Sequence, residues 1–195
     1  MLDDLNYLNM AEIKSFCKQH SIPYAIVIET QDGRAKRTGD DDRKGVILGR
    51  IRHFLRTGAV LKETRFPSSV VCLEPPPEDL TPADRLFYGQ YDKTNRSMIA
   101  LLKDLTDGKF ENGAIARILA RDFWARGTAP TFREYASAWL RATAEHTRPN
   151  AEWAFLSDRA DKTASPHWKQ VRANKASKVI ETLNQIASGR QRNRL

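Results

Sequence analysis

Apolar residues recur at helical spacing near the N-terminus, over residues 9–21. The residues that would share one face of such a helix are Ile13, Phe16 and Cys17. Asn9 is followed three positions later by Glu12, which is typical of a capping box, where each side chain bonds the other residue's backbone N–H. The pattern therefore predicts a short helix that begins after Asn9 and ends before Pro23.

The pattern changes from helical to extended over residues 24–37. Residues 24–28 are rich in residues that favour strands, and Gln31-Asp32-Gly33 is typical of a tight turn. The arm after the turn is basic, with Arg34, Lys36 and Arg37. The sequence therefore predicts a small β-hairpin.

A second helix is expected to begin at three consecutive acids, Asp40, Asp41 and Asp42, and to stop at Gly58. Acidic side chains at a helix start can cap it and interact favourably with its dipole. The apolar positions that share one face are Ile47, Leu48, Ile51, Phe54 and Leu55. The arginines at 50, 52 and 56 lie away from the centre of this stripe.

Residues 63–79 are expected to link two domains. Three consecutive prolines at 75–77 cannot continue a helix and favour an extended backbone. A short strand is predicted over residues 69–73. The expected division is therefore a module over 1–62, this linker, and a helical domain over 80–195.

The pattern beyond the linker is strongly helical. Thr81-Pro82 is typical of a helix start, with Thr81 as the cap. Four further helices are predicted, over 94–106, 111–126, 131–145 and 165–189. Thr131 and Glu134 form a second capping box at the start of the third of these. The tryptophans and phenylalanines on these helices are expected in the core.

Charge is concentrated at the two ends of the chain, whose formal net charge is +8. Lys and Arg outnumber Asp and Glu by 11 to 8 in residues 1–62 and by 9 to 4 in residues 149–195, but they are equal, 12 and 12, in residues 63–148. This distribution favours polyanion binding. No apolar run approaches the ~18 residues of a membrane span, and the acidic N-terminus is unlike a secretory signal, so we expect a cytoplasmic protein without a membrane partner.

Two segments resemble the halves of the SAP motif. AEIKSFCKQHSIP, residues 11–23, is similar to its first half, with Ser21 where the family usually has glycine. KGVILGRI, residues 44–51, is similar to its second half, and Thr38-Gly39 resembles the Ser-Gly that precedes it. The family joins its two helices by a few residues, whereas residues 24–42 intervene here. The resemblance covers about the first third of the chain.

The resemblance implies a helix–extended–helix module that binds DNA. The contact residues that it implies are Gly39, Arg43, Lys44 and Arg50, with Lys14 and Lys18 as flanking candidates. Electrostatics supports these contact residues, because a helix N-terminus and nearby cations attract phosphate. Asp40–Asp42 would repel phosphate, so we expect these acids to cap the helix and point away; alternatively, they form part of a protein-binding surface.

The last predicted helix has a basic ridge opposite its apolar stripe. The ridge consists of Lys169, Arg172, Lys175 and Lys178, spaced by three and four residues. It is either a second phosphate-binding surface or a solvated face. Leu80-Thr81-Pro82, with Tyr91, Asn95, Phe110 and Trp139, also resembles an uncharacterised helical domain found beside SAP-like N-termini in bacterial proteins, a resemblance that implies no activity.

The sequence contains no pattern that indicates an enzyme. No motif of a serine hydrolase, zinc protease, P-loop or dinucleotide site occurs, and the four histidines are dispersed. The two cysteines, Cys17 and Cys72, lie far apart, so neither a disulfide framework nor a zinc site is expected. Asp40–Asp42 could hold magnesium in a nuclease only if consecutive acids converged, which one turn does not easily allow. We expect a protein that is not an enzyme and needs no cofactor or metal.

The sequence as a whole predicts a mainly α protein, with a SAP-like module, a possible small hairpin insert and a small helical domain. The expected function is DNA binding through phosphate contacts with little sequence readout, since no base-reading side chain stands out. RNA binding is an alternative, because phosphate contacts do not distinguish the two nucleic acids. A protein–protein adaptor is another, with the neutral helical domain docking a protein partner. A nucleoid-associated location would fit DNA binding.

Overall fold

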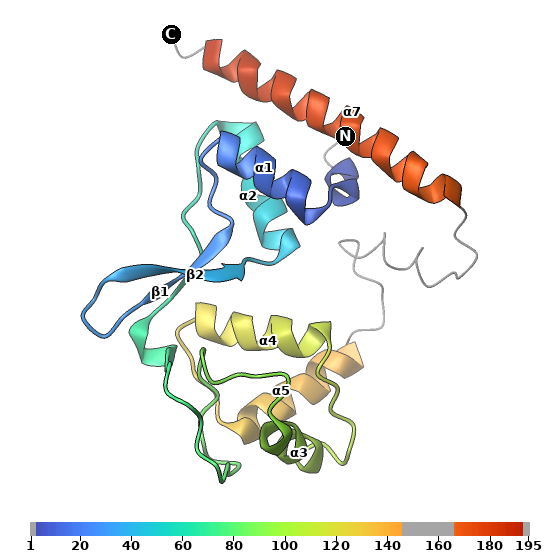
Figure 1. Cartoon of the computed structure of the whole chain (residues 1–195). Coiled ribbons are helices and arrows are strands. Elements are labelled where there is room, and N and C mark those ends of the chain that lie inside the picture. The colour runs from blue at the N-terminus through green and yellow to red at the C-terminus, as the bar shows by residue number, and fades with distance from the viewer. Residues whose placement is uncertain (1–2, 146–165, 193–195) are drawn as a thin grey trace. The chain divides into compact units, whose positions relative to one another are not determined.

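The computed structural model describes residues 3–145 and 166–192 (Figure 1). The chain divides into two compact units, each built from segments distant in sequence. Unit 1 comprises residues 1–25, 41–63 and 148–195, and unit 2 comprises residues 26–40 and 64–147. This division differs from the linear one expected, because the predicted hairpin groups with the middle of the chain and the last helix with the N-terminal helices.

Unit 1 begins with a 3₁₀ turn, η1 (Asp3–Tyr7), and the helix α1 (Met10–Gln19). The predicted capping box is confirmed: the Asn9 side chain accepts from the Glu12 N–H at 2.9 Å, and the Glu12 carboxylate accepts from the Asn9 N–H at 2.7 Å. The helix α2 (Lys44–Thr57) ends at Gly58, whose positive φ of 73° suits glycine. The predicted apolar faces of both helices are buried, apart from the partly exposed Phe54.

The long C-terminal helix, α7 (Pro166–Arg192), completes the core of unit 1. It packs on η1 and α2, and the side chains that it buries there are Ala176, Val179, Leu183 and Ala187. The expected helix end at Gly189 is wrong, since the helix continues through this residue. The N-terminal helices and α7 therefore share one hydrophobic core.

Unit 2 contains a three-stranded sheet with the order β2-β1-β3. The strands β1 (Ala25–Glu29) and β2 (Ala35–Asp41) form the predicted hairpin, closed by a hydrogen bond from the Thr30 N–H to the Arg34 carbonyl at 2.9 Å. The strand β3 (Arg65–Phe66) pairs in parallel with β1. A short 3₁₀ turn, η2 (Ser68–Val70), follows.

The segment expected to be a linker is thus part of the fold of unit 2. Phe66 and Val70 are fully buried in its core. The strand predicted over residues 69–73 is wrong: β3 lies earlier, and within residues 69–73 Val71 forms an isolated bridge with Tyr88. The helix predicted to start at Thr81-Pro82 is also wrong. Here Asp84 accepts hydrogen bonds from the backbone and hydroxyl of Thr81 in a tight turn, and the next helix begins at Arg96.

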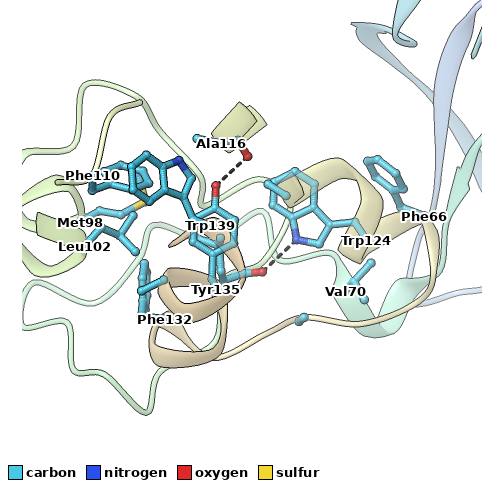
Figure 2. Close-up of a cluster of buried hydrophobic side chains, with 14 of the residues drawn as sticks. Phe66, Val70, Met98, Leu102, Phe110, Ala116, Trp124, Phe132, Tyr135 and Trp139 are labelled. Atoms are coloured by element: carbon cyan, nitrogen blue, oxygen red, sulfur yellow. Dashed lines mark hydrogen bonds between the residues drawn. The ribbon is translucent and has the colours of Figure 1, made fainter. Parts of the chain in front are cut away.

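Three helices supply most of the core of unit 2, namely α3 (Arg96–Asp104), α4 (Ala114–Ala125) and α5 (Phe132–Glu145). The predicted capping box of Thr131 and Glu134 is present at the start of α5. Trp124 and Trp139 lie in the core, as expected, whereas Trp153 and Trp168 are outside the described side chains. Two aromatic side chains also bond to backbone: the Tyr135 hydroxyl donates to the Ala116 carbonyl at 2.7 Å, and the Trp124 indole N–H to the Leu86 carbonyl at 2.9 Å (Figure 2). These bonds fix α4 and α5 within the unit.

The described residues are therefore mainly helical with one small sheet. None of the described helices is both long and apolar enough to cross a bilayer.

Candidate nucleic-acid interface

None of the three consecutive acids is the N-cap residue of α2, contrary to expectation. Asp40 and Asp41 belong to β2, and the N-cap position of α2 is Arg43, which makes no side-chain cap hydrogen bond. Each of the three carboxylates is bonded to a different residue. Asp40 accepts from the Tyr88 hydroxyl at 2.7 Å, and Asp41 from the Lys14 ammonium at 2.6 Å. The repulsion that these acids were expected to exert on phosphate is thus partly neutralised locally.

Asp42 is bonded to Arg50, which is a structural residue rather than a contact residue. The Arg50 Nη2 lies 3.0 Å from the Asp42 Oδ2, and both side chains are about 5% exposed. The guanidinium also donates to the carbonyls of Pro23 and Lys62, each at 3.1 Å. Arg50 is therefore buried and satisfied, so it cannot reach a nucleic acid, and the expectation that it binds DNA is wrong.

The two predicted flanking lysines on α1 differ in their surroundings. Lys14 is half-buried in its ion pair with Asp41, and its ammonium lies 5.7 Å from the centre of the Tyr24 ring. Lys18 is exposed in the last turn of α1. Of the two, Lys18 is the better placed to contact a partner.

Lys44 and Lys175, expected on separate surfaces, meet on η1. The Lys44 ammonium donates to the Asn6 carbonyl at 2.6 Å. The Lys175 ammonium donates to the Tyr7 hydroxyl at 3.0 Å and lies 4.3 Å from the centre of that ring. Because Asn6 and Tyr7 are consecutive, the tertiary structure gathers cations from α2 and α7 around one turn. No sequence signal assigned the C-terminal ridge to this place.

The remaining predicted residues are distributed as follows. Arg43 is half-buried at the start of α2, and Lys178 is exposed on α7, one turn beyond Lys175. Gly39 lies in β2 and belongs to unit 2, where a Cβ at this position would meet no atom within 4 Å. The side chains of Lys169 and Arg172 lie outside the described residues. Apart from the buried Arg50, six of the predicted residues whose side chains are described belong to unit 1, and they are Lys14, Lys18, Arg43, Lys44, Lys175 and Lys178.

The entire net charge of the protein belongs to unit 1. This unit contains 18 Lys and Arg against 10 Asp and Glu, whereas unit 2 contains 14 of each. The sequence already showed this excess at the two ends of the chain, and the fold adds that these ends belong to the same unit. A positive unit joined to a neutral one concentrates the attraction for polyanions on the former.

The hairpin of unit 2 also exposes cations. Residues 31–37 are all exposed, and they include Arg34, Lys36 and Arg37. Asp32 is the one acid among them, and it pairs with Arg34 at 3.3 Å. The sequence showed this basic arm, although it did not single it out as a contact site. Since unit 2 is neutral as a whole, the hairpin gives only a local positive field.

Cys17 is inert in this environment. It is fully buried in the core of unit 1, and burial raises the pKa of its thiol to about 12, despite the nearby positive charge of Arg50. Within residues 3–145 and 166–192, no three His, Cys, Asp or Glu side chains are grouped so as to hold a metal ion.

Comparison of the chain with protein-family models, curated proteins and solved structures gave no match.

Proposed function

We propose that this protein is a cytoplasmic DNA-binding protein whose unit 1 contacts phosphates. The observation that supports this proposal best is the segregation of charge, +8 on unit 1 and zero on unit 2. Cations bound near a DNA backbone release its condensed counterions, which drives binding whatever the base sequence. The resemblance of the N-terminal helices to the SAP motif points to the same function.

The proposed contact surface differs from the one that the motif alone implies. Arg50 is not part of this surface, because its side chain is buried in an ion pair with Asp42. The exposed cations Lys18, Lys175 and Lys178 become the main candidates, together with the partly buried Lys44 and Arg43. Together they present charge from α1, α2 and α7 within one unit, which supports phosphate contacts rather than base readout.

The test is the binding of the full chain to a labelled short DNA duplex, measured by fluorescence anisotropy at increasing salt. We expect affinity to fall linearly with salt on logarithmic axes. Lys18→Glu/Lys178→Glu is the informative variant, since both side chains are exposed. It should weaken binding and reduce the salt slope by about 2, roughly one for each lost phosphate contact.

The matched control is Arg133→Glu/Arg141→Glu, which reverses two exposed charges on α5 of the neutral unit. This variant should bind DNA nearly as well as the unmodified chain. Equal losses from both double variants would contradict an interface on unit 1. Absence of binding to duplex at low salt would overturn the DNA proposal, and binding to RNA alone under the same conditions would redirect it to that nucleic acid.

A further inference from the structure

A cavity of about 350 Å³ lies within unit 2, and none of the residues proposed above to contact DNA lines it. It lies beside α4, next to the loop that joins Tyr88 to Lys93. Its volume falls within the ~300–1,000 Å³ typical of small-molecule sites. The cavity therefore has room for a ligand, and its lining determines which kind.

One wall of the cavity is aromatic and rigid. Tyr88 and Tyr91 meet the Trp124 ring edge to face, with centroids 5.5 and 6.0 Å away. Trp124 is itself held by the bond from its indole N–H to the Leu86 carbonyl. Such a wall suits a planar ring, because aromatic rings stack or meet edge to face with a gain in free energy.

Cations line the cavity as well. Arg117 and Arg121 are four residues apart on α4, and so lie on the same face of that helix. Lys93 joins them from the loop before α3. Arg117 and Lys93 are exposed, so a ligand can reach them from solvent. Guanidinium groups bind phosphate through paired hydrogen bonds, so this set of side chains favours an anion.

The two carboxylates of the lining already have donors within the protein. Asp40 accepts from the Tyr88 hydroxyl at 2.7 Å and lies 3.8 Å from Arg121. Asp92 accepts from the backbone N–H and the hydroxyl of Thr94, the closest contact being 2.7 Å. Three cations thus face two engaged acids, which leaves the cavity with a net positive lining even though unit 2 as a whole is neutral.

We propose that this cavity binds a small phosphorylated ligand that carries a planar ring, of about the size of a nucleoside monophosphate. The phosphate would lie against Arg117, Arg121 and Lys93, and the ring against the tyrosines. This proposal is independent of DNA binding by unit 1.

The test is calorimetric titration of the full chain with adenosine monophosphate, uridine monophosphate, adenosine and inorganic phosphate. The proposal predicts that one or both nucleotides bind, and that adenosine and phosphate bind at least about tenfold more weakly, because each lacks half of the contacts. The indole N–H resonance of Trp124, assigned with Trp124→Phe, should shift on binding. Equal affinity for nucleotide and phosphate, or no heat with any of the four probes, would overturn it.

Arg117→Gln/Lys93→Gln tests the location without disturbing the contacts of Asp40. Both residues are exposed, and neither holds the core. The variant should lose at least about tenfold in nucleotide affinity, the equivalent of one charge-assisted hydrogen bond. Its control, Arg133→Gln/Arg141→Gln, removes the same charge from α5 and should bind normally. Unchanged affinity in the cavity variant would place any nucleotide elsewhere and overturn the proposal, whatever the result with DNA.

Discussion

Arg50, in the middle of α2, reaches back to Asp42 just before the helix, and the two form a buried ion pair of 3.0 Å. The same Asp42 carboxylate also accepts from the Arg43 N–H at 2.9 Å. A buried pair of this kind is costly to break, because the remaining charge loses its partner in a medium of low polarity. Arg50, one of the contact residues that the SAP resemblance implies, is therefore an internal brace of unit 1.

Asp42→Asn should destabilise the protein by about 3–5 kcal/mol, because it leaves the Arg50 charge uncompensated. Urea denaturation followed by circular dichroism measures this loss. The matched control is Asp41→Asn, which removes the neighbouring carboxylate from a pair with Lys14 that is about a third exposed. It should cost less than about 1 kcal/mol. Similar losses in the two variants would show that the Arg50 pair is not a special brace.

Leu183→Ala should destabilise unit 1, since Leu183 is 3% exposed in a core shared with α1 and α2. Removing a buried leucine costs about 2–5 kcal/mol through lost burial and the cavity left behind. The control, Gln185→Ala, changes an exposed residue on the same helix. If thermal unfolding were the same for both variants, α7 would not contribute to this core.

The two cysteines should differ sharply in reactivity. Cys17 is fully buried with a pKa of about 12, so almost no thiolate forms at mild alkaline pH, whereas Cys72 is partly exposed. A chromogenic thiol reagent should therefore modify one cysteine rapidly in the native protein and the second only after denaturant is added. Cys72→Ser should abolish the rapid phase. Persistence of that phase in the variant would contradict the burial of Cys17.

Tyr88 should contribute to stability in a pH-dependent way. Burial, followed by the hydrogen bond to Asp40, raises its pKa from 10.0 to about 12. The folded state therefore holds the phenolic proton more tightly than the unfolded state does. This contribution is fully present below pH 10 and is lost as the pH rises toward about 12. The difference in melting temperature between the protein and Tyr88→Phe should shrink over that interval, and a constant difference would contradict it.

Local features were well predicted, because short-range physics decides them. The capping boxes at Asn9 and Thr131 rest on side chains three residues apart, and both form as expected. The hairpin turn before Arg34 and the end of α2 at Gly58 follow from local backbone preferences in the same way. The start signal at Thr81-Pro82 is the exception. There the Asp84 carboxylate closes a turn that does not continue as a helix.

The residues that form the candidate sites could not be predicted from sequence spacing, because they are brought together by contacts between distant segments. The apolar stripe of the last helix required a partner, but nothing in its pattern selected η1 and α2 over the adjacent helical segment. In the same way, the position of Arg50 beside the apolar stripe of α2 predicts a partly exposed side chain. Arg50 is buried instead, because the Pro23 and Lys62 carbonyls and the Asp42 carboxylate surround it.

The sequence by itself determined where most of the helices and the hairpin lie, most of the apolar faces that they bury, and the net charge of +8. Only the tertiary structure decided which segments form each unit, and so that the whole of this charge belongs to one of them. It also brought Lys44 and Lys175 onto consecutive residues of η1 and lined a cavity of unit 2 with cations. The physical reason is that helix and turn formation depend on neighbours within a few residues, whereas burial and charge clustering depend on long-range packing.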